Sequence, residues 1–278
     1  MRFSRLWPAV SLVIGSLFLG LSLPAQDALP LNPADKPAPS AVKAPAPPNP
    51  YWERARLIVD HSVRERLAQA LATPDFGLLS RQQLRRGDVT RKMIALTIDD
   101  GPHARFTPQL LAVLNKYHVK ATFFLVGKMA EKYPDLVLEE VADGHAIGNH
   151  TYHHVDLTTI PAVDVATEIK ACGEVIKHIT GKAPHLFRPP GGDFDFQVTT
   201  ASAELGYTTV LWSDDPGDYA SPGIPVITTR TLDHATNGGI ILLHDGVQQT
   251  VDALPTIIES LRARGYEFVT VDEMMNRK

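Results

Sequence analysis

From Arg91 onward, short apolar runs alternate with amphipathic stretches of helical length, and this alternation restricts the chain to few folds. Parallel strands cannot be joined by tight turns, so each pair needs a crossover, usually a helix. The runs predict seven strands, at residues 93–98, 121–126, 145–150, 185–188, 207–212, 239–244 and 268–271. A complete (β/α) barrel has about eight. We therefore predict an α/β fold with a distorted or incomplete (β/α) barrel of about seven parallel strands, and an open doubly wound sheet is the alternative.

The first 50 residues have the composition of export and spacer segments. Arg2 and Arg5 precede an apolar run over residues 6–23, which predicts a signal peptide or, if uncleaved, an N-terminal anchor at 1–25. Eight of the 25 residues at 26–50 are proline, so a Pro/Ala-rich linker is expected there. Whether residues 1–25 are a cleaved signal peptide or an uncleaved anchor, the rest of the chain is expected outside the cytoplasm.

Residues 51–90 are expected to form a helical N-terminal segment, followed by the α/β domain at 91–278. Leu57, Leu67 and Leu71 have loose helical spacing, and the sequence at 73–74, Thr-Pro, favours the end of that helix. A short second helix is predicted over 81–88. No chemistry is assigned to this segment, which is interpreted as a helical brace.

Charge and cysteine content exclude two classes of site. The 27 Lys and Arg residues against 31 Asp and Glu leave a net charge of -4, which provides no basic surface for nucleic acid. One cysteine, Cys172, cannot form an intrachain disulfide or supply a thiolate metal site. A metal would therefore need His and carboxylate ligands, and the chain has 11 histidines.

Polar residues collect at the predicted carboxyl ends of the strands, where parallel α/β folds place their chemistry. These residues are Asp99, Asp100, His150, Arg188, Asp215, Asp218 and His244. In HTYHH, His150 and His154 are four residues apart, so one helical turn would direct both imidazoles at one ion. His153 lies on the same helical face, and spacing alone does not choose between 153 and 154. Two histidines and a carboxylate suit zinc and other divalent metals.

Three further motifs supply groups for catalysis and binding. Arg188 in RPPGG is suited to orient a carboxylate through two hydrogen bonds. In LWSDDPGDY, Trp212 and Tyr219 offer ring faces for a sugar. His244 ends the apolar run ILLH, and its position at a strand end favours a general acid.

Taken together, TIDDGP, HTYHH, RPPGG, DPGDY and ILLHD resemble, in order and spacing, the five motifs of the polysaccharide deacetylases, carbohydrate esterase family four, over residues 91–273. The resemblance implies that Asp99 is the general base and that Asp100, His150 and His154 bind the metal. It also implies that His244 is the general acid, that Arg188 positions Asp99, and that an aspartate of DPGDY, assigned to Asp215, tunes His244.

The resemblance further implies a backbone oxyanion donor at Gly191 and an acetyl pocket lined by Leu242. Gly191 stands where many members have Tyr, and Tyr219 replaces the more usual Trp, so these two positions bear on substrate preference. The implied cofactor is a divalent metal, Zn²⁺ first, with Co²⁺ and Ni²⁺ as alternatives.

The resulting hypothesis is an exported, metal-dependent hydrolase that removes N-acetyl groups from N-acetylglucosamine glycans such as peptidoglycan or chitin. The alternatives are an O-acetyl esterase acting on a polysaccharide such as xylan, and an inactive glycan-binding module. The expected partner is the polysaccharide, with no nucleic acid and no protein partner implied, and with membrane contact only through an uncleaved N-terminus. The expected location is periplasmic, cell-envelope associated or secreted.

Overall fold

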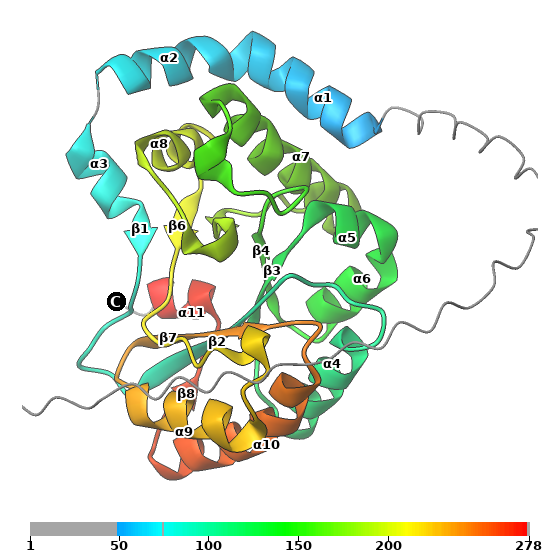
Figure 1. Ribbon diagram of the computed structural model, residues 1–278, viewed down its shortest axis with the longest axis vertical. Helices are drawn as coiled ribbons and strands as arrows, with labels where there is room; N and C mark the ends of the chain where they lie inside the picture. Colours follow the sequence, from blue (N-terminus) through cyan, green and yellow to red (C-terminus); the bar gives the residue numbers. More distant parts are fainter. Residues whose placement is uncertain (1–48, 74, 277–278) are drawn as a thin grey trace, which may run out of the picture. The chain divides into compact units, whose positions relative to one another are not determined.

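Parallel strands in one strongly curled sheet form the centre of the computed structural model, which describes residues 49–73 and 75–276 (Figure 1). Within the described residues the sheet has eight strands in the order β1-β6-β5-β4-β3-β2-β7, with β8 paired to β2. The strands are β1 (Gln83–Leu84), β2 (Met93–Asp99), β3 (Thr122–Leu125), β4 (Ala146–Asn149), β5 (Leu186–Phe187), β6 (Thr208–Val210), β7 (Gly239–His244) and β8 (Glu267–Phe268).

Helices cover the outside of the curled sheet and connect its strands (Figure 1). The α-helices are α1 (Pro50–Ile58), α2 (Arg64–Ala72), α3 (Phe76–Arg81), α4 (Thr107–Lys116), α5 (Gly127–Lys132), α6 (Pro134–Ala142), α7 (Ala162–Thr180), α8 (Phe196–Glu204), α9 (Ile224–His234), α10 (Gln248–Ala263) and α11 (Val271–Asn276). Shorter turns are the π-helical η2 (Val59–Val63) and the 3-10 turns η3 (Leu157–Thr159), η4 (Pro190–Gly192) and η5 (Asp218–Ala220).

The prediction of an incomplete barrel is confirmed. All seven predicted strands are present, and they pair in parallel as a half-barrel. After β6, Asp214 forms an isolated parallel bridge with Ile241 of β7. The curl of the sheet turns one of its faces inward, so that the carboxyl ends of distant strands converge on one rim.

Alternation along the strands separates the outer core from the barrel interior, because successive side chains of a strand point to opposite faces. On β2, Ile94, Leu96 and Ile98 pack in the outer cluster with residues of α4 and α10. Met93 and Ala95 belong to an inner cluster that also contains Met274 of α11. The same period places Thr97 and Asp99 on the inner face, and on β7 it places Leu242 and His244 there.

Helices α1 and α2, joined by η2, form one continuous helical rod that packs along α7 and α8 (Figure 1). Its buried side chains are Ala55, Val59, Val63 and Leu67, each four residues after the last. A repeat of four drifts around an α-helix of 3.6 residues per turn. The wider π turn η2 reduces that drift, which keeps these residues on one face. Leu57 lies in α1, as its spacing predicts, but it is 59% exposed and is not one of these buried residues.

Two segments near the ends of the domain differ from the prediction. Residues 81–88, expected to be helical, contain strand β1, because Gln83 and Leu84 pair with Thr209 and Val210 of β6. The helical pattern is overridden by pairing with a strand that is far away in the sequence. At the C-terminus the predicted strand 268–271 is shorter, and helix α11 follows at once.

The predicted signal at 1–25 lies outside the described residues, as does the linker up to residue 48. Within the part of the chain that the structure describes, no helix has the length and apolar character needed to span a membrane.

Candidate active site

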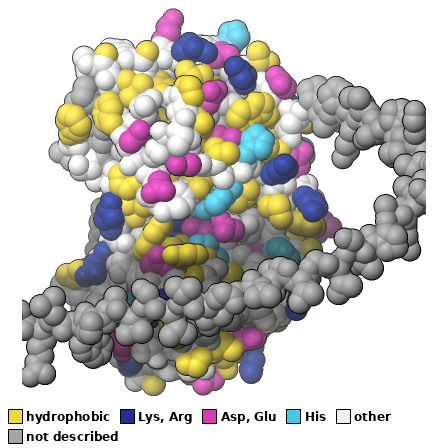
Figure 2. All heavy atoms as spheres, viewed as in Figure 1, with side chains coloured by type: hydrophobic (Ala, Val, Ile, Leu, Met, Phe, Trp, Pro, Cys, Tyr) yellow, Lys and Arg dark blue, Asp and Glu magenta, His cyan; other side chains and the backbone are white. Residues whose placement is uncertain are grey.

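A pocket of about 340 Å³ lies at the carboxyl ends of the strands and gathers residues from every sequence motif. Its lining residues are Asp99, Asp100, His150, His154, Gly191, Gly192, Trp212, Asp215, Tyr219, Leu242 and His244. Of the expected site residues, only Arg188 is absent from this lining, and it is fully buried and bonded to Asp99. Figure 2 shows histidine and acidic side chains close together near the middle of the face turned to the viewer.

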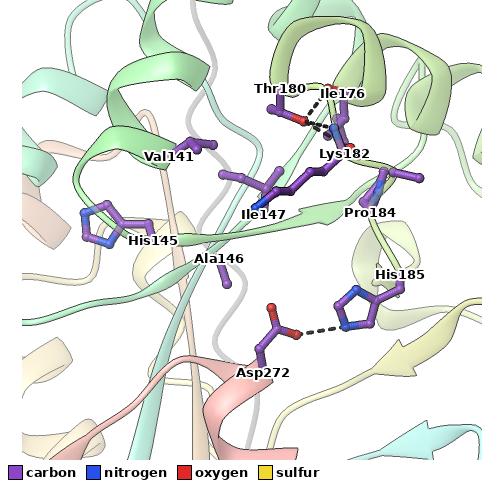
Figure 3. Close-up of a pocket in the computed structure, with 11 residues that line it drawn as sticks. Val141, His145, Ala146, Ile147, Ile176, Thr180, Lys182, Pro184, His185 and Asp272 are labelled. Atoms are coloured by element: carbon purple, nitrogen blue, oxygen red, sulfur yellow. Dashed lines mark hydrogen bonds and ion pairs between the residues drawn. The ribbon is translucent and has the colours of Figure 1, made fainter.

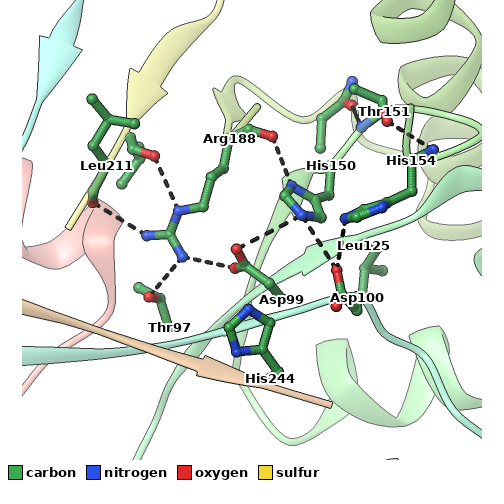
Figure 4. Close-up of polar contacts among 12 residues, drawn as sticks. Thr97, Asp99, Asp100, Leu125, His150, Thr151, His154, Arg188, Leu211 and His244 are labelled. Atoms are coloured by element: carbon green, nitrogen blue, oxygen red, sulfur yellow. Dashed lines mark hydrogen bonds and ion pairs between the residues drawn. The ribbon is translucent and has the colours of Figure 1, made fainter. Parts of the chain in front are cut away.

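Asp99 is held in the pocket by a buried arginine. The Nη1 of Arg188 donates to Asp99 Oδ1 at 2.7 Å and to Thr97 Oγ1 at 2.8 Å (Figure 4). Its other nitrogens donate to the carbonyl oxygens of Val210 and Leu211. Burial lowers the pKa of Arg188, and the charge of Asp99 opposes that shift. A buried charge is tolerated when it is paired and hydrogen-bonded in this way, so the contact with Arg188 fixes the position of the Asp99 carboxylate.

Asp100, His150 and His154 form a set of three ligands whose donor atoms lie within 4.8 Å of one another. Asp100 Oδ1 is 3.0 Å from His154 Nε2 and 3.4 Å from His150 Nε2 (Figure 4). His150 Nδ1 lies 2.7 Å from the Arg188 carbonyl oxygen, which can only accept, so Nδ1 is the donor and Nε2 is the ring nitrogen that faces Asp100. Metal-binding histidines are oriented by such bonds.

These three residues fit a divalent cation. Asp100 Oδ1 is buried and has no hydrogen-bond donor among the described residues, although it faces two ring nitrogens. Burial alone would raise the pKa of Asp100, but His150 and His154 hold that pKa well below its ordinary value. An ionised carboxylate beside two imidazoles matches the two-histidine, one-carboxylate set that binds zinc with an open position.

The structure separates the two histidines that spacing left open. His154 faces Asp100, whereas His153 turns away and its Nδ1 lies 2.7 Å from Glu168 Oε1. The expected helical turn is wrong, because residues 150–154 form a loop with Thr151 and His154 at φ of 65° and 59°. Left-handed residues in this loop, and not helical spacing, bring His154 to the side of His150.

Asp218, and not Asp215, is the partner of His244. Asp218 Oδ1 lies 2.7 Å from His244 Nδ1, and Asp218 Oδ2 accepts from the His244 backbone N–H and from Thr250 Oγ1. Asp215 is exposed, and its Oδ1 accepts from the Gly217 N–H. Asp218 is the partner because the turn at 215–217 reverses the chain and brings residue 218 against β7. The assignment of the tuning role to Asp215 is therefore corrected.

Glycines and aromatic rings form another wall of the pocket. Gly191 and Gly192 have φ of 65° and 72°, and a Cβ on Gly192 would lie 2.3 Å from a ring atom of Trp212. Tyr219 is 63% exposed and its ring centroid is 5.5 Å from that of His244. Leu242 is buried on β7, two residues before His244. This wall combines backbone, aromatic faces and one apolar side chain.

Three residues that contact the site were absent from the predicted set. Thr97 accepts from Arg188, Thr250 donates to Asp218, and Glu168 contacts His153. The strand period predicts the position of Thr97, because it lies two residues before Asp99. Thr250 and Glu168 lie on helices α10 and α7, and nothing in the local sequence marks them.

A second cavity, of about 250 Å³, lies at the amino ends of β4 and β5 (Figure 3). Val141, Ile147 and Ile176 give it an apolar wall, and His185 Nε2 pairs with Asp272 Oδ1 at 2.9 Å on one side. It contains none of the motif residues. In parallel barrels this end of the strands is structural, so the chemistry is assigned to the first pocket.

Comparison with known proteins shows which family this chain belongs to. The polysaccharide deacetylase family profile matches residues 86–210. A peptidoglycan-N-acetylglucosamine deacetylase of Bacillus cereus is 42% identical over 192 residues, which are 67% of this chain and 90% of the relative. The chain belongs to the polysaccharide deacetylase family. It is an enzyme of that family, a polysaccharide deacetylase.

Other relatives agree with this assignment. A peptidoglycan-N-acetylglucosamine deacetylase of Listeria monocytogenes is 34% identical over 239 residues, which cover 85% of this deacetylase and 49% of the relative. The deacetylase therefore spans about half the length of the Listeria protein. The crystal structure of the Bc1960 peptidoglycan N-acetylglucosamine deacetylase superposes with a TM-score of 0.69 at 35% identity, covering 72% of this chain and 95% of that one.

Proposed function

We propose that this deacetylase is an exported, metal-dependent hydrolase that removes N-acetyl groups from N-acetylglucosamine residues of peptidoglycan or a related glycan. The observation that carries this proposal is the meeting of three groups in one pocket: the Asp99 carboxylate, the His244–Asp218 pair and the ligand set of Asp100, His150 and His154. Together they supply a base, an acid and a cation site for one amide bond.

Asp99 is suited to act as the general base. Its Oδ1 is bonded to Arg188, and its Oδ2 faces the pocket at 3.8 Å from His150 Nε2. When bound by Asp100, His150 and His154, a divalent ion supplies Lewis acidity that polarises the acetyl carbonyl and makes a neighbouring water more acidic. Asp99 accepts a proton from the attacking water while the water oxygen bonds to the carbonyl carbon. The Gly191 N–H is the proposed donor to the developing oxyanion.

His244 is suited to act as the general acid. Burial lowers its pKa, but the bond to Asp218 and nearby carboxylates outweigh that effect and raise the pKa to about 9. The imidazole is therefore protonated at neutral pH. It donates its proton to the amide nitrogen as the carbon–nitrogen bond breaks, which produces acetate and a free amine.

Substrate and location are proposed from the relatives and the N-terminal sequence. The Bacillus cereus and Listeria relatives carry the name of peptidoglycan-N-acetylglucosamine deacetylases. Residues 1–25 have the pattern of an export signal, which would place the enzyme beside that polymer. Leu242 is the proposed contact of the acetyl methyl group, and Trp212 and Tyr219 of the sugar rings.

The proposal is tested by acetate release from peptidoglycan, chitin oligosaccharides and acetylated xylan, using metal-stripped enzyme with and without added zinc. We expect zinc to restore release from the N-acetylated polymers. Asp99→Asn is expected to reduce that release by about 10²–10⁴-fold, the range of a lost general base. Asp135→Asn makes the same chemical change on the exposed surface of α6 and should leave the rate unchanged.

Each alternative gives a different result. If acetate is released from acetylated xylan alone, the substrate is an O-acetyl ester and not an N-acetyl group. Zinc binding without release from any acetylated polymer would favour a glycan-binding module. Full activity of the metal-stripped enzyme would refute metal dependence.

A further inference from the structure

The loop that carries the two proposed metal-binding histidines is under backbone strain. Thr151 and His154 have φ of 65° and 59°, a left-handed conformation that is strained for a residue with a Cβ. The side chain of His154 is 40% exposed, whereas that of His150 is 2% exposed. His154 is thus the ligand with the least support from the core, and its position depends on contacts that hold the loop.

On its inner side the loop is anchored to α7. Glu168 is 3% exposed, and its Oε2 accepts from the backbone N–H groups of Tyr152 and His153. Its Oε1 lies 2.7 Å from His153 Nδ1. This carboxylate fixes the backbone between the two ligands from one side.

On its outer side the loop is covered by the start of α1, more than ninety residues earlier in the chain. The ring of Trp52 packs edge-on against His153 with centroids 4.9 Å apart, and lies 6.2 Å from the ring of Tyr152. The side-chain amide of Asn49 donates to the Tyr152 hydroxyl and to Glu131 Oε2, and the same hydroxyl donates to Glu131. Tyr152 and His153 are thereby held between α1 and α7.

We propose that Asn49 and Trp52 are positioning residues that clamp loop 150–154, so that the N-terminal helix determines how well His154 meets the metal. The proposal rests on the proposed metal-dependent function. Groups that orient a metal ligand indirectly affect affinity, and loss of such a group usually weakens binding by 10–100-fold. A helix that only braced the domain would affect stability without changing metal affinity.

The test uses the full chain and compares two neighbouring aromatic residues of α1. Trp52→Ala removes the contact with the loop. Tyr51→Ala is the matched control, because the ring of Tyr51 packs on His178 of α7. We expect Trp52→Ala to weaken zinc binding about tenfold in a chelator competition titration. Tyr51→Ala should stay within about twofold of wild type, and Trp52→Phe should recover most of the lost affinity.

A second variant separates the clamp from folding of the helix. The Asn49 Oδ1 accepts from the N–H groups of Tyr51 and Trp52 and so caps α1. Asn49→Asp keeps this cap but turns a carboxylate toward Glu131, which breaks the bond to the loop. We expect weaker zinc binding with little loss of thermal stability, and faster hydrogen exchange at the Tyr152 and His153 amides.

The outcomes distinguish the two proposals. If Trp52→Ala binds zinc as tightly as Tyr51→Ala, the clamp is refuted and the metal-dependent function stands. If the wild-type chain binds no divalent metal, both are refuted. Selective loss of affinity in Trp52→Ala and Asn49→Asp, with recovery in Trp52→Phe, supports the clamp.

Discussion

At the scale of the residue, the protonated form of His244 depends on one carboxylate. Asp218 is fully buried and bonds to the ring and the backbone of His244, while Thr250 holds its second oxygen. Its negative charge, close to the imidazole in a site of low polarity, offsets the effect of burial. Asp215 has no comparable contact, although it is only three residues away.

Replacing Asp218 by Asn should therefore lower the pKa of His244 from about 9 toward or below its ordinary 6.5. In the proposed mechanism activity needs the protonated imidazole, so the decline of kcat/KM at alkaline pH should begin at a lower pH than in wild type. Asp215→Asn should leave the pH at which this decline begins unchanged. The check is a pH profile of kcat/KM for all three proteins, and an alkaline decline that moves in the Asp215 variant alone would contradict this pairing.

At the scale of the element, the turn η4 depends on two glycines with different surroundings. Both Gly191 and Gly192 have left-handed backbone, but a Cβ on Gly191 would meet only the side chain of Asp193, at 3.1 Å. A Cβ on Gly192 would overlap the ring of Trp212, which lies 5.6 Å from the Arg188 guanidinium. The second glycine thus sets how closely the turn approaches the wall of the pocket.

Alanine at either position should cost roughly 1–2 kcal/mol of unfolding free energy through backbone strain. Gly192→Ala should cost about 1–3 kcal/mol more, because Trp212 must move. Urea denaturation of both variants measures the difference, and tryptophan fluorescence reports the displaced ring. Equal losses in the two variants would show that the ring gives way without cost.

At the scale of the whole molecule, the proposed metal site joins segments that only the folded barrel brings together. Asp100 follows β2, while His150 and His154 follow β4, and β3 lies between these strands. The unfolded chain has no such site, so a bound ion stabilises the native state alone.

Zinc at about 100 times its dissociation constant should add about 2.7 kcal/mol to the unfolding free energy of the metal-stripped enzyme. For a domain of this size that is a rise in Tm of about 5–10 °C. His150→Ala should abolish the rise, and His61→Ala, an exposed histidine on η2, should retain it. Calorimetry with and without zinc makes the comparison, and a persistent rise in the His150 variant would place the ion elsewhere.

The sequence by itself determined the features that depend on local order along the chain. The alternation of short apolar runs with stretches of helical length set the seven strands and the half-barrel, and polar residues at strand ends set the rim on which Asp99, Asp100, His150, Arg188 and His244 meet. These predictions worked because an apolar run of strand length and its carboxyl end are properties of the segment itself.

Only the tertiary structure decided which of two near neighbours faces the site. The choice of Asp218 over Asp215, three residues away, depends on the backbone reversal at 215–217. Spacing alone also left His153 and His154 open; the resemblance implied His154, and the left-handed residues at 151–154 turn it toward Asp100. The tertiary structure was also needed to find strand β1 and the contacts of Glu168, Thr250 and Trp52. Each is a pairing between segments distant in sequence, and its energy comes from a partner that the local sequence does not contain.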